Sequence, residues 1–384
     1  MRNPKFLVFF SIILILYASI NYYILQQGIF LLEKGSSWRV FWTICIVIFA
    51  ASFIAGRFLE RRMINPFSAI VVWAGAFWLA FMVYILIQLI LIDFISILDH
   101  WFRILPSFVH TNPLKTKKIL GIAVITISSI FVISGHINTW FPKIKNLDIS
   151  IHKKARSLKS LNIVAFSDVH LGTLIEKRHL ARIIKKVNSL NPDIILIPGD
   201  IIDEDINPVI HSNVGETLRT LKAKYGVYAV TGNHEYIGGV AKAKEYLKSH
   251  GIKLLNDTAM LIDNSFYVAG REDLMKNQSA NKRKGLDEIT HDIQKDLPLI
   301  LMDHQPFHLE QAEKNGVDLQ LSGHTHHGQL WPFNYITNLV YEKSWGYLQK
   351  GNTHYYVSCG VGGWGPPIRT VSRPEIVNIK IHFD

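Results

Sequence analysis

The sequence is poor in cysteine, with only Cys45 and Cys359 among 384 residues. Cys45 lies in an apolar stretch and Cys359 far away in the polar part of the chain, so we expect no disulfide between them. No Cys-x-x-Cys pair occurs, which excludes the cysteine-rich zinc motifs.

Long charged stretches are missing from the first third of the chain, which is mostly apolar. Runs of about 20 apolar residues, the length that crosses a bilayer, begin at Phe6, Trp38, Phe67 and Ile119. No clear cleavage site follows the first run, which argues against a signal peptide, and four successive runs argue against buried core helices. We predict an all-α membrane domain of about four spans over residues 1–145.

The formal net charge is +11 and the sequence pI about 9.4. Such a balance fits nucleic acid, an anionic membrane surface or positive-inside topology signals. If the N-terminus is cytoplasmic, the basic residues on that side outnumber those on the other side. The inner group is Arg2, Lys5, Arg57, Arg61, Arg62, Lys143, Lys145, Lys153, Lys154, Arg156 and Lys159, and the outer group is Lys34, Arg39, Arg103, Lys115, Lys117 and Lys118. We predict an integral protein of a bacterial-type inner or plasma membrane with a cytoplasmic C-terminal domain.

The second domain, residues 146–384, alternates short β-branched runs with helical patterns. The segment 177–190 places Leu180, Ile183, Ile184 and Val187 on one helical face, and apolar runs of strand length recur from about residue 160 to the end. This alternation predicts an α/β domain with buried strands.

Potential metal ligands follow five of these predicted strands. They are Asp168 and His170, then Asp200, then Asn233 and His234, then Asp303 and His304, then His324 and His326. Sites in open α/β sheets form beyond the carboxyl ends of strands. Carboxylates, imidazoles and an amide suit Mn²⁺, Fe²⁺ or Zn²⁺ rather than Cu(I) or an iron–sulfur cluster. The ligands are too many for one ion, so we expect two divalent metal ions.

These residues resemble the calcineurin-like metallophosphoesterase superfamily. The matching blocks are DVH (168–170), GD (199–200), GNHE (232–235), His304 in DHQP, and GHTH (323–326). The ending IRTVSRPEIVNI (368–379) is similar to that of the YkuE/YaeI-type branch, whose members are often membrane-associated. The resemblance covers about residues 160–384. It implies a two-sheet β-sandwich flanked by helices, which the strand pattern alone does not predict.

The resemblance also implies the roles of the site residues. One ion would be held by Asp168, His170 and His326, the other by Asn233, His304 and His324, and Asp200 would bridge both. Two cations neutralise the anionic phosphoester and acidify a water, so a metal-bridging hydroxide would attack phosphorus. His234 belongs to neither set and is the candidate proton donor to the leaving oxygen. The alternative is that His234 only orients a ligand.

Other residues near these motifs admit more than one interpretation. Asp303 is a ligand neighbour that could support the site, and Arg271 and Arg369 could meet a phosphate, although a surface or structural role is favoured for both. His327 is expected to point away from the site. The segment 271–285, a long polar run with basic residues, could bind substrate, although the interpretation as a solvated loop is favoured. The aromatic-rich segment 330–348 could line a lipid-accepting groove, touch the bilayer, or simply pack over the domain.

Three functions remain open from the sequence. The favoured one is a membrane-anchored phosphodiesterase or pyrophosphatase, with a lipid-linked phosphoester as one candidate substrate. The second is a nuclease, which four membrane spans disfavour, so nucleic acid is not an expected partner. The third is a non-catalytic membrane scaffold, which the complete ligand set disfavours. A transport role is disfavoured because Asp93 and His136 lie near span ends.

Overall fold

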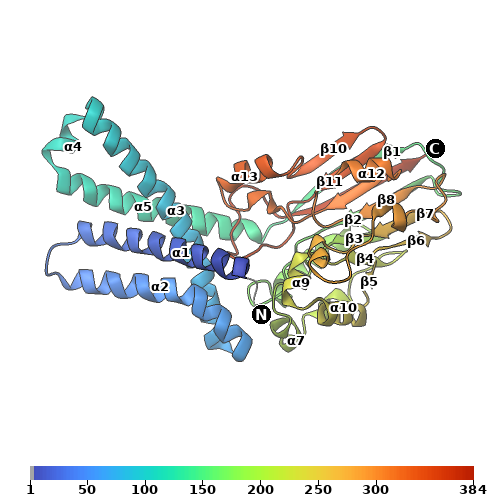
Figure 1. Cartoon of the computed structure of the whole chain (residues 1–384), viewed down its shortest axis with the longest axis horizontal. Coiled ribbons are helices and arrows are strands. Elements are labelled where there is room, and N and C mark those ends of the chain that lie inside the picture. The colour runs from blue at the N-terminus through green and yellow to red at the C-terminus, as the bar shows by residue number, and fades with distance from the viewer. Residues whose placement is uncertain (1–3) are drawn as a thin grey trace. The chain divides into compact units, whose positions relative to one another are not determined.

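The computed structural model describes residues 4–384, with the side chains of residues 4–7 and 9 left undescribed. Arg2, and the side chain of Lys5, therefore lie outside the described part of the chain. The chain forms two compact units that divide between Ser134 and Gly135 (Figure 1). The first strand of the second unit begins at Lys143. The predicted domain boundary after residue 145 stays a prediction.

The first unit is helical. Its helices are α1 (Pro4–Leu31), α2 (Ser37–Arg62), α3 (Pro66–Phe102), α4 (Ser107–Thr111) and α5 (Pro113–Thr139), whose last five residues belong to the second unit. Within the described residues, α1, α2, α3 and α5 are the four helices long and apolar enough to span a bilayer. Asn65 and Ser68 form a reciprocal cap at the start of α3, and Pro66 occupies its first turn. The prediction of four apolar helices is confirmed.

The second unit contains two six-stranded mixed sheets. The first sheet has the strand order β1-β12-β2-β3-β4-β5, and the second has the order β10-β11-β9-β8-β7-β6. The strands of the first are β1 (Lys143–Ile151), β12 (Glu375–Phe383), β2 (Ser160–Ala165), β3 (Ile194–Pro198), β4 (Val227–Val230) and β5 (Lys253–Leu254). Those of the second are β10 (Gly346–Lys350), β11 (Thr353–Val357), β9 (Leu319–Ser322), β8 (Leu299–Met302), β7 (Phe266–Gly270) and β6 (Thr258–Ile262).

The two sheets pack face to face between layers of helices (Figure 1). Side chains of both sheets, including Ile163, Leu196, Val268 and Ile300, share one buried core. A second core lies between the first sheet and its helices, and a third covers the outer face of the second sheet. The helices of this unit are α6 (Lys177–Ser189), α7 (Asn207–His211), α8 (Gly215–Leu218), α9 (Asn233–Gly238), α10 (Val240–Ser249), α11 (Leu286–Ile289), α12 (Glu310–Lys314) and α13 (Phe333–Val340). The predicted helix-flanked two-sheet fold is confirmed.

Strands β2, β3 and β4 are parallel neighbours in the first sheet, and β8 and β9 are parallel neighbours in the second. Carboxyl ends of parallel strands meet at the same edge of a sheet, so these five strands deliver their following loops to one place. The strand pattern missed the four edge strands β1, β5, β6 and β10, all of which have partly exposed faces. The residue pattern of 214–223 predicts a helix over all ten residues, and this prediction is wrong in extent because only Gly215–Leu218 is helical.

Candidate metal centre

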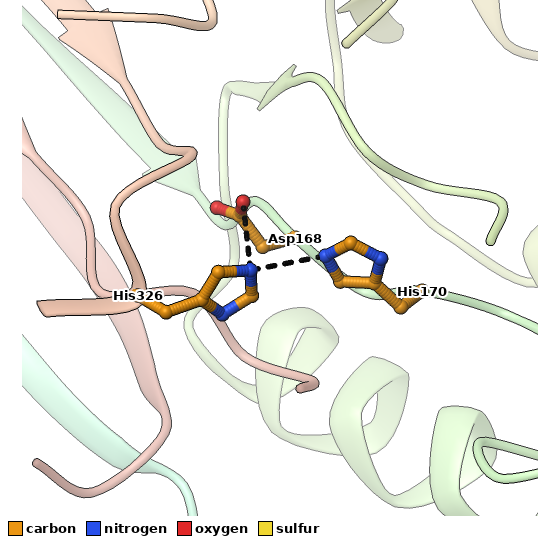
Figure 2. A group of neighbouring side chains, drawn as sticks. All are labelled: Asp168, His170 and His326. Carbon is orange, nitrogen blue, oxygen red and sulfur yellow. Dashed lines mark hydrogen bonds and ion pairs between the residues drawn. The ribbon is translucent and has the colours of Figure 1, made fainter. Parts of the chain in front are cut away.

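The structure brings the eight predicted site residues together at the carboxyl ends of β2, β3, β4, β8 and β9. One group comprises Asp168, His170 and His326, all buried (Figure 2). The Nε2 atoms of His170 and His326 lie 3.1 Å apart, and Nε2 of His326 lies 3.5 Å from an oxygen of Asp168. Asp168 is held in place because its carboxylate accepts hydrogen bonds from the backbone N–H of His324 and the Ser167 hydroxyl.

A second group gathers Asp200, His304 and His324. The amide oxygen of Asn233 lies among them, 3.1 Å from Nε2 of His304 and 2.7 Å from Nδ1 of His324. Asn233 begins helix α9 directly after β4, so the turn places its side chain over the end of the sheet. The four residues expected around the second ion thus converge on one another.

Asp200 lies between the two groups. Its Oδ2 atom is 3.1 Å from Nε2 of His304 and 3.7 Å from Nε2 of His170. The Oδ1 atom accepts a hydrogen bond of 3.0 Å from the backbone N–H of His234. One carboxylate oxygen therefore faces an imidazole from each group.

His304 provides a test of whether these donors fit a cation. Its Nδ1 lies 2.8 Å from the carbonyl oxygen of Pro198 and must donate to it. A neutral ring then has a lone pair on Nε2, which would face the oxygens of Asp200 and Asn233 without a hydrogen between them. These three acceptors, Nε2 of His304 and the oxygens of Asp200 and Asn233, can lie this close together only if a cation lies between them. The cation can be a proton or a metal ion. The donors therefore fit divalent metal ions.

Burial and charge set the protonation of the ligand groups. Burial lowers the pKa of His324 to about 3, and the charge of His304 adds to the effect. Burial also holds the pKa of His326 well below its ordinary value, helped by the positive charges of His170 and Arg369. Burial alone would raise the pKa of Asp200, but His304 and His170 hold it below the ordinary range. His324 and His326 thus present neutral imidazoles and Asp200 an ionised carboxylate, the protonation states that metal ligation needs. Burial alone would lower the pKa of His304, but the charge of Asp200 and the contact with its carboxylate raise it well above its ordinary value, so a metal ion would replace the proton on this ring.

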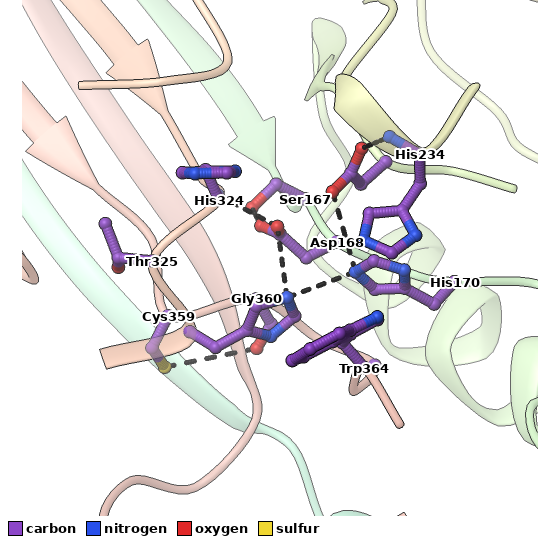
Figure 3. A network of polar contacts seen from close by, with 12 residues as sticks. Ser167, Asp168, His170, His234, His324, Thr325, Cys359, Gly360 and Trp364 are labelled. Atoms are coloured by element: carbon purple, nitrogen blue, oxygen red, sulfur yellow. Dashed lines mark hydrogen bonds and ion pairs between the residues drawn. The ribbon is translucent and has the colours of Figure 1, made fainter. Parts of the chain in front are cut away.

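His234 is held by a residue that the sequence patterns did not single out. Its Nδ1 lies 3.1 Å from Oδ1 of Asp203, and its ring stands edge-on to that of His170 (Figure 3). Burial alone would lower the pKa of His234, but the hydrogen bond to Asp203 and the charge of Asp200 raise it to about 9. The spacing of Asp203, three residues after a metal-ligand candidate on the same loop, is the only sequence signal for it.

Glu235 and Arg369 stabilise the loops that carry the candidate ligands. The Glu235 carboxylate accepts the backbone N–H groups of Ile202 and Gly232, which joins the loops after β3 and β4. Arg369 is fully buried, donates to the carbonyl of Gly362, and places its guanidinium 3.1 Å from Nδ1 of His326. Arg369 is therefore structural, as favoured from the sequence.

The other candidates lie outside the ligand cluster. Asp303 pairs with Arg271 and Arg283 at 3.1 and 3.0 Å. His327 turns away toward the Ser344 hydroxyl, as expected. The interpretation of 271–285 as a solvated loop is wrong for its first three residues, Arg271, Glu272 and Asp273, which are at most 5% exposed. They are buried because Glu272 bonds Thr231 and Tyr236, while Asp273 accepts from Gln305.

Comparison with known proteins identifies the second unit. Residues 161–328 match the family model for calcineurin-like phosphoesterases. An uncharacterized metallophosphoesterase of Campylobacter jejuni is 30% identical over 388 residues, covering 98% of both chains. Uncharacterized metallophosphoesterase YkuE of Bacillus subtilis is 34% identical over 56% of this chain and 76% of its own length. A zebrafish (Danio rerio) transmembrane protein with metallophosphoesterase domain is 33% identical over 66% of this chain, and the match spans 61% of that protein.

Proposed function

Because the chain belongs to the calcineurin-like metallophosphoesterase family, we propose that it is a membrane-anchored phosphoesterase that uses two divalent metal ions. The bond it hydrolyses is a phosphodiester or a pyrophosphate. The proposal combines two features of the chain, namely four helices of spanning length and a cluster of metal-ligand side chains. The observation that supports the proposal most directly is the position of Asp200 between the two ligand groups. A pair of metal ions requires a bridging carboxylate of this kind.

The ligands divide into two sets. Asp168, His170 and His326 would hold one ion. Asn233, His304 and His324 would hold the other, with Asp200 shared between them. When bound, such ions supply positive charge to phosphoryl oxygens and acidify water to a nucleophile near neutral pH. Manganese, iron and zinc all suit this donor set.

His234 is proposed as the proton donor to the leaving oxygen. Asp203 accepts from its Nδ1, which fixes the ring and leaves Nε2 as the nitrogen that can donate outward. The backbone of His234 is anchored to Asp200, so the ring has a fixed position relative to the ligand groups. A positioned acid of this kind is needed most by leaving groups that are strong bases.

The proposed substrate is a phosphoester attached to a lipid. An enzyme permanently anchored by spanning helices meets membrane-borne substrates at a high local concentration. The excess of basic residues on the predicted inner side favours a cytoplasmic location for the catalytic unit. Nucleic acid is not proposed as a partner, because much of the basic charge lies in segments next to the predicted spans.

The experiment is Mn²⁺-dependent hydrolysis of bis-p-nitrophenyl phosphate by the detergent-purified full chain, beside Asp200→Ala. We expect Asp200→Ala to lower kcat by about a thousandfold or more, because several kcal/mol of transition-state stabilisation is lost. The matched control is Asp148→Ala, whose carboxylate is exposed in the first sheet. Equal activity of Asp200→Ala and wild type, or activity in wild type without any bound metal, would refute the proposal.

A further inference from the structure

Helix α13 (Phe333–Val340) exposes its apolar side. Tyr335, Ile336, Leu339 and Val340 fall on one helical face, and they are 62%, 56%, 88% and 56% exposed. The polar Asn334 and Thr337 on the opposite side are half-buried. A surface helix of a water-soluble domain has the reverse arrangement, with its apolar face toward the core. Packing within this unit therefore does not explain the side chains of α13.

Aromatic residues extend this apolar face at the N-terminal end of α13. Trp331 precedes the helix, and Phe333 is its first residue. Trp364 lies near them because its backbone N–H donates to the side chain of Gln329 and its carbonyl accepts from the same side chain. Trp364 is 51% exposed and Trp331 is 43% exposed. We call these side chains the apolar surface; they are Trp331, Phe333, Tyr335, Ile336, Leu339, Val340 and Trp364. A patch of this kind marks an interaction site rather than ordinary surface.

The apolar surface lies beside the point where the chain leaves the last spanning helix. Residues 135–139 end α5 and belong to the second unit, where Gly135 accepts from the backbone N–H of Arg369 and Asn138 donates to the Arg369 carbonyl. The next residue, Thr370, accepts from the backbone N–H of Trp331 at 2.9 Å. Trp140 and the exposed Phe141 follow α5 directly, as aromatic residues do where a helix meets the membrane interface.

The same surface reaches the site histidines. Tyr341, the residue after α13, has its ring 6.1 Å from that of His324. The Trp364 ring lies 6.1 Å from that of His234, and Figure 3 shows it beside the site. A molecule lying on the apolar surface would thus have its polar end at the candidate metal centre.

We propose that the apolar surface binds the interface of the bilayer that the spans cross, so that α13 lies among headgroups and upper acyl chains. The partner is a lipid surface rather than another protein, because Arg369 and Thr370 connect this surface to the last residues of the spanning helix α5 and because Trp, Tyr and Leu are residue types of such contacts. The part that concerns catalysis rests on the proposed function. During catalysis, the surface holds a membrane-borne substrate so that its phosphoester reaches the candidate metal centre while the acyl chains of the substrate remain in the bilayer.

The binding is tested without any activity measurement. The test uses the full chain with Cys45→Ser as the background. Leu339→Cys introduces a thiol on the apolar surface, and Ile210→Cys introduces one at the control position. Each introduced thiol is labelled with an environment-sensitive fluorophore. Cys359 does not compete, because it is fully buried and burial raises the pKa of its thiol to about 12. Ile210 is a matched control because it is also exposed, at 52%, but lies on α7.

The labelled proteins are placed in nanodiscs of phosphatidylethanolamine and phosphatidylglycerol. We expect nitroxide-bearing lipids to quench the probe at Leu339 and aqueous iodide to quench the probe at Ile210. If iodide reaches the Leu339 probe as readily as the Ile210 probe, the apolar surface does not bind the bilayer and the inference is overturned.

The catalytic part is tested with two chromogenic diesters that share a leaving group. One is soluble bis-p-nitrophenyl phosphate and the other is the diacylglycerol p-nitrophenyl phosphodiester in vesicles. Ile336→Asp with Leu339→Asp should lower the rate on the vesicle substrate about tenfold, because two apolar side chains that would enter the bilayer become charges. The rate on the soluble substrate should stay unchanged. Ile210→Asp should change neither rate. An equal loss on both substrates would overturn the presenting role, whereas absence of activity in wild type would overturn the proposed function instead.

Discussion

At the scale of single residues, the structure explains how three of the five imidazoles of the site are oriented. The ring of His304 is oriented by the Pro198 carbonyl, that of His234 by Asp203, and that of His326 lies against Arg369. Each contact occupies the nitrogen that faces away from the ligand cluster, so the other nitrogen is directed inward. Such supporting contacts set both the tautomer and the aim of a ligand.

His234 is predicted to act in proton transfer rather than metal binding. His234→Ala should keep both ions and lower kcat by about 10²–10⁴ for a diester with an alkyl leaving group. With p-nitrophenolate, a weak base, the loss should be much smaller because that group leaves without a proton. The measurement is kcat on both substrates together with metal content by mass spectrometry.

His327→Ala is the control for this experiment, since His327 is a neighbour of the site that bonds Ser344 instead. Loss of metal in His234→Ala, or equal losses with both leaving groups, would show that His234 positions a ligand and does not donate a proton.

At the scale of elements, the loops that follow the strands are shaped so that ligands point inward. Asp168, His170, Asp200, His324 and His326 all adopt positive φ, between 47° and 71°. Non-glycine residues occupy this left-handed region at a cost of about 1–2 kcal/mol each. The buried cores on both sides of the first sheet hold these turns in place.

Gly232 is predicted to be essential for metal binding because Asp200 and His304 lie too close to it for a side chain to fit. Its backbone angles do not require glycine. Its φ is an ordinary −103°, but a Cβ there would clash with Oδ1 of Asp200 and lie 2.7 Å from Nε2 of His304. Gly232→Ala should therefore weaken metal binding by about 10–100-fold, a typical loss when ligands are misplaced. Titration of Mn²⁺ binding on the purified full chain measures the effect.

Gly363→Ala is the matched substitution, because a Cβ at Gly363 meets nothing nearer than the side chain of Gln329 at 3.3 Å. It should bind metal as wild type does. Unchanged metal affinity in Gly232→Ala would contradict the geometry described for this turn.

Helix α6 is predicted to make the second unit sensitive to acid through His179. This residue packs against Trp140, and burial lowers its pKa to about 4, helped by the charge of Arg182. In the unfolded chain this histidine takes up a proton below about pH 6.5, whereas in the folded chain it stays neutral down to about pH 4. The free energy of unfolding therefore has its full value above about pH 6.5 and decreases as the pH falls toward 4. The expected loss is about 2 kcal/mol between pH 7 and pH 5.

Thermal unfolding of wild type and His179→Gln at both pH values tests this expectation. The variant should lose less stability on acidification than wild type, whereas His291→Gln, at an exposed position, should behave as wild type. A pH dependence that is identical in all three proteins would exclude His179 as its source.

At the scale of the whole molecule, a helical unit and a two-sheet unit share one continuous helix, α5. The four candidate spans predict that both ends of the chain lie on one side of the membrane, and the basic residues favour the cytoplasm. Green fluorescent protein fused to the C-terminus should be fluorescent, and alkaline phosphatase fused there should be inactive. The opposite pair of results would place the catalytic unit outside and would reverse the topology.

Much of this architecture could be predicted from local sequence. The apolar runs specify spanning helices because length and composition alone decide whether a segment can cross a bilayer. Strands β2, β3, β4, β8 and β9 were predictable because buried parallel strands are continuous apolar runs. Strands β1, β5, β6 and β10 were missed, because their partly exposed faces give a weaker pattern than a buried run.

The sequence by itself determined which side chains are available as ligands and in what order, since strand ends and motif spacing are local properties. Only the tertiary structure decided that Asp200 lies between two ligand groups, that Asp203 holds His234, and that Arg369 is buried behind His326. It also decided that the apolar face of α13 points outward, although the pattern of α13 is that of any amphipathic helix. The physical reason is common to all four: a side chain's neighbours across loops are set by how sheets and helices pack, and local periodicity does not encode that packing.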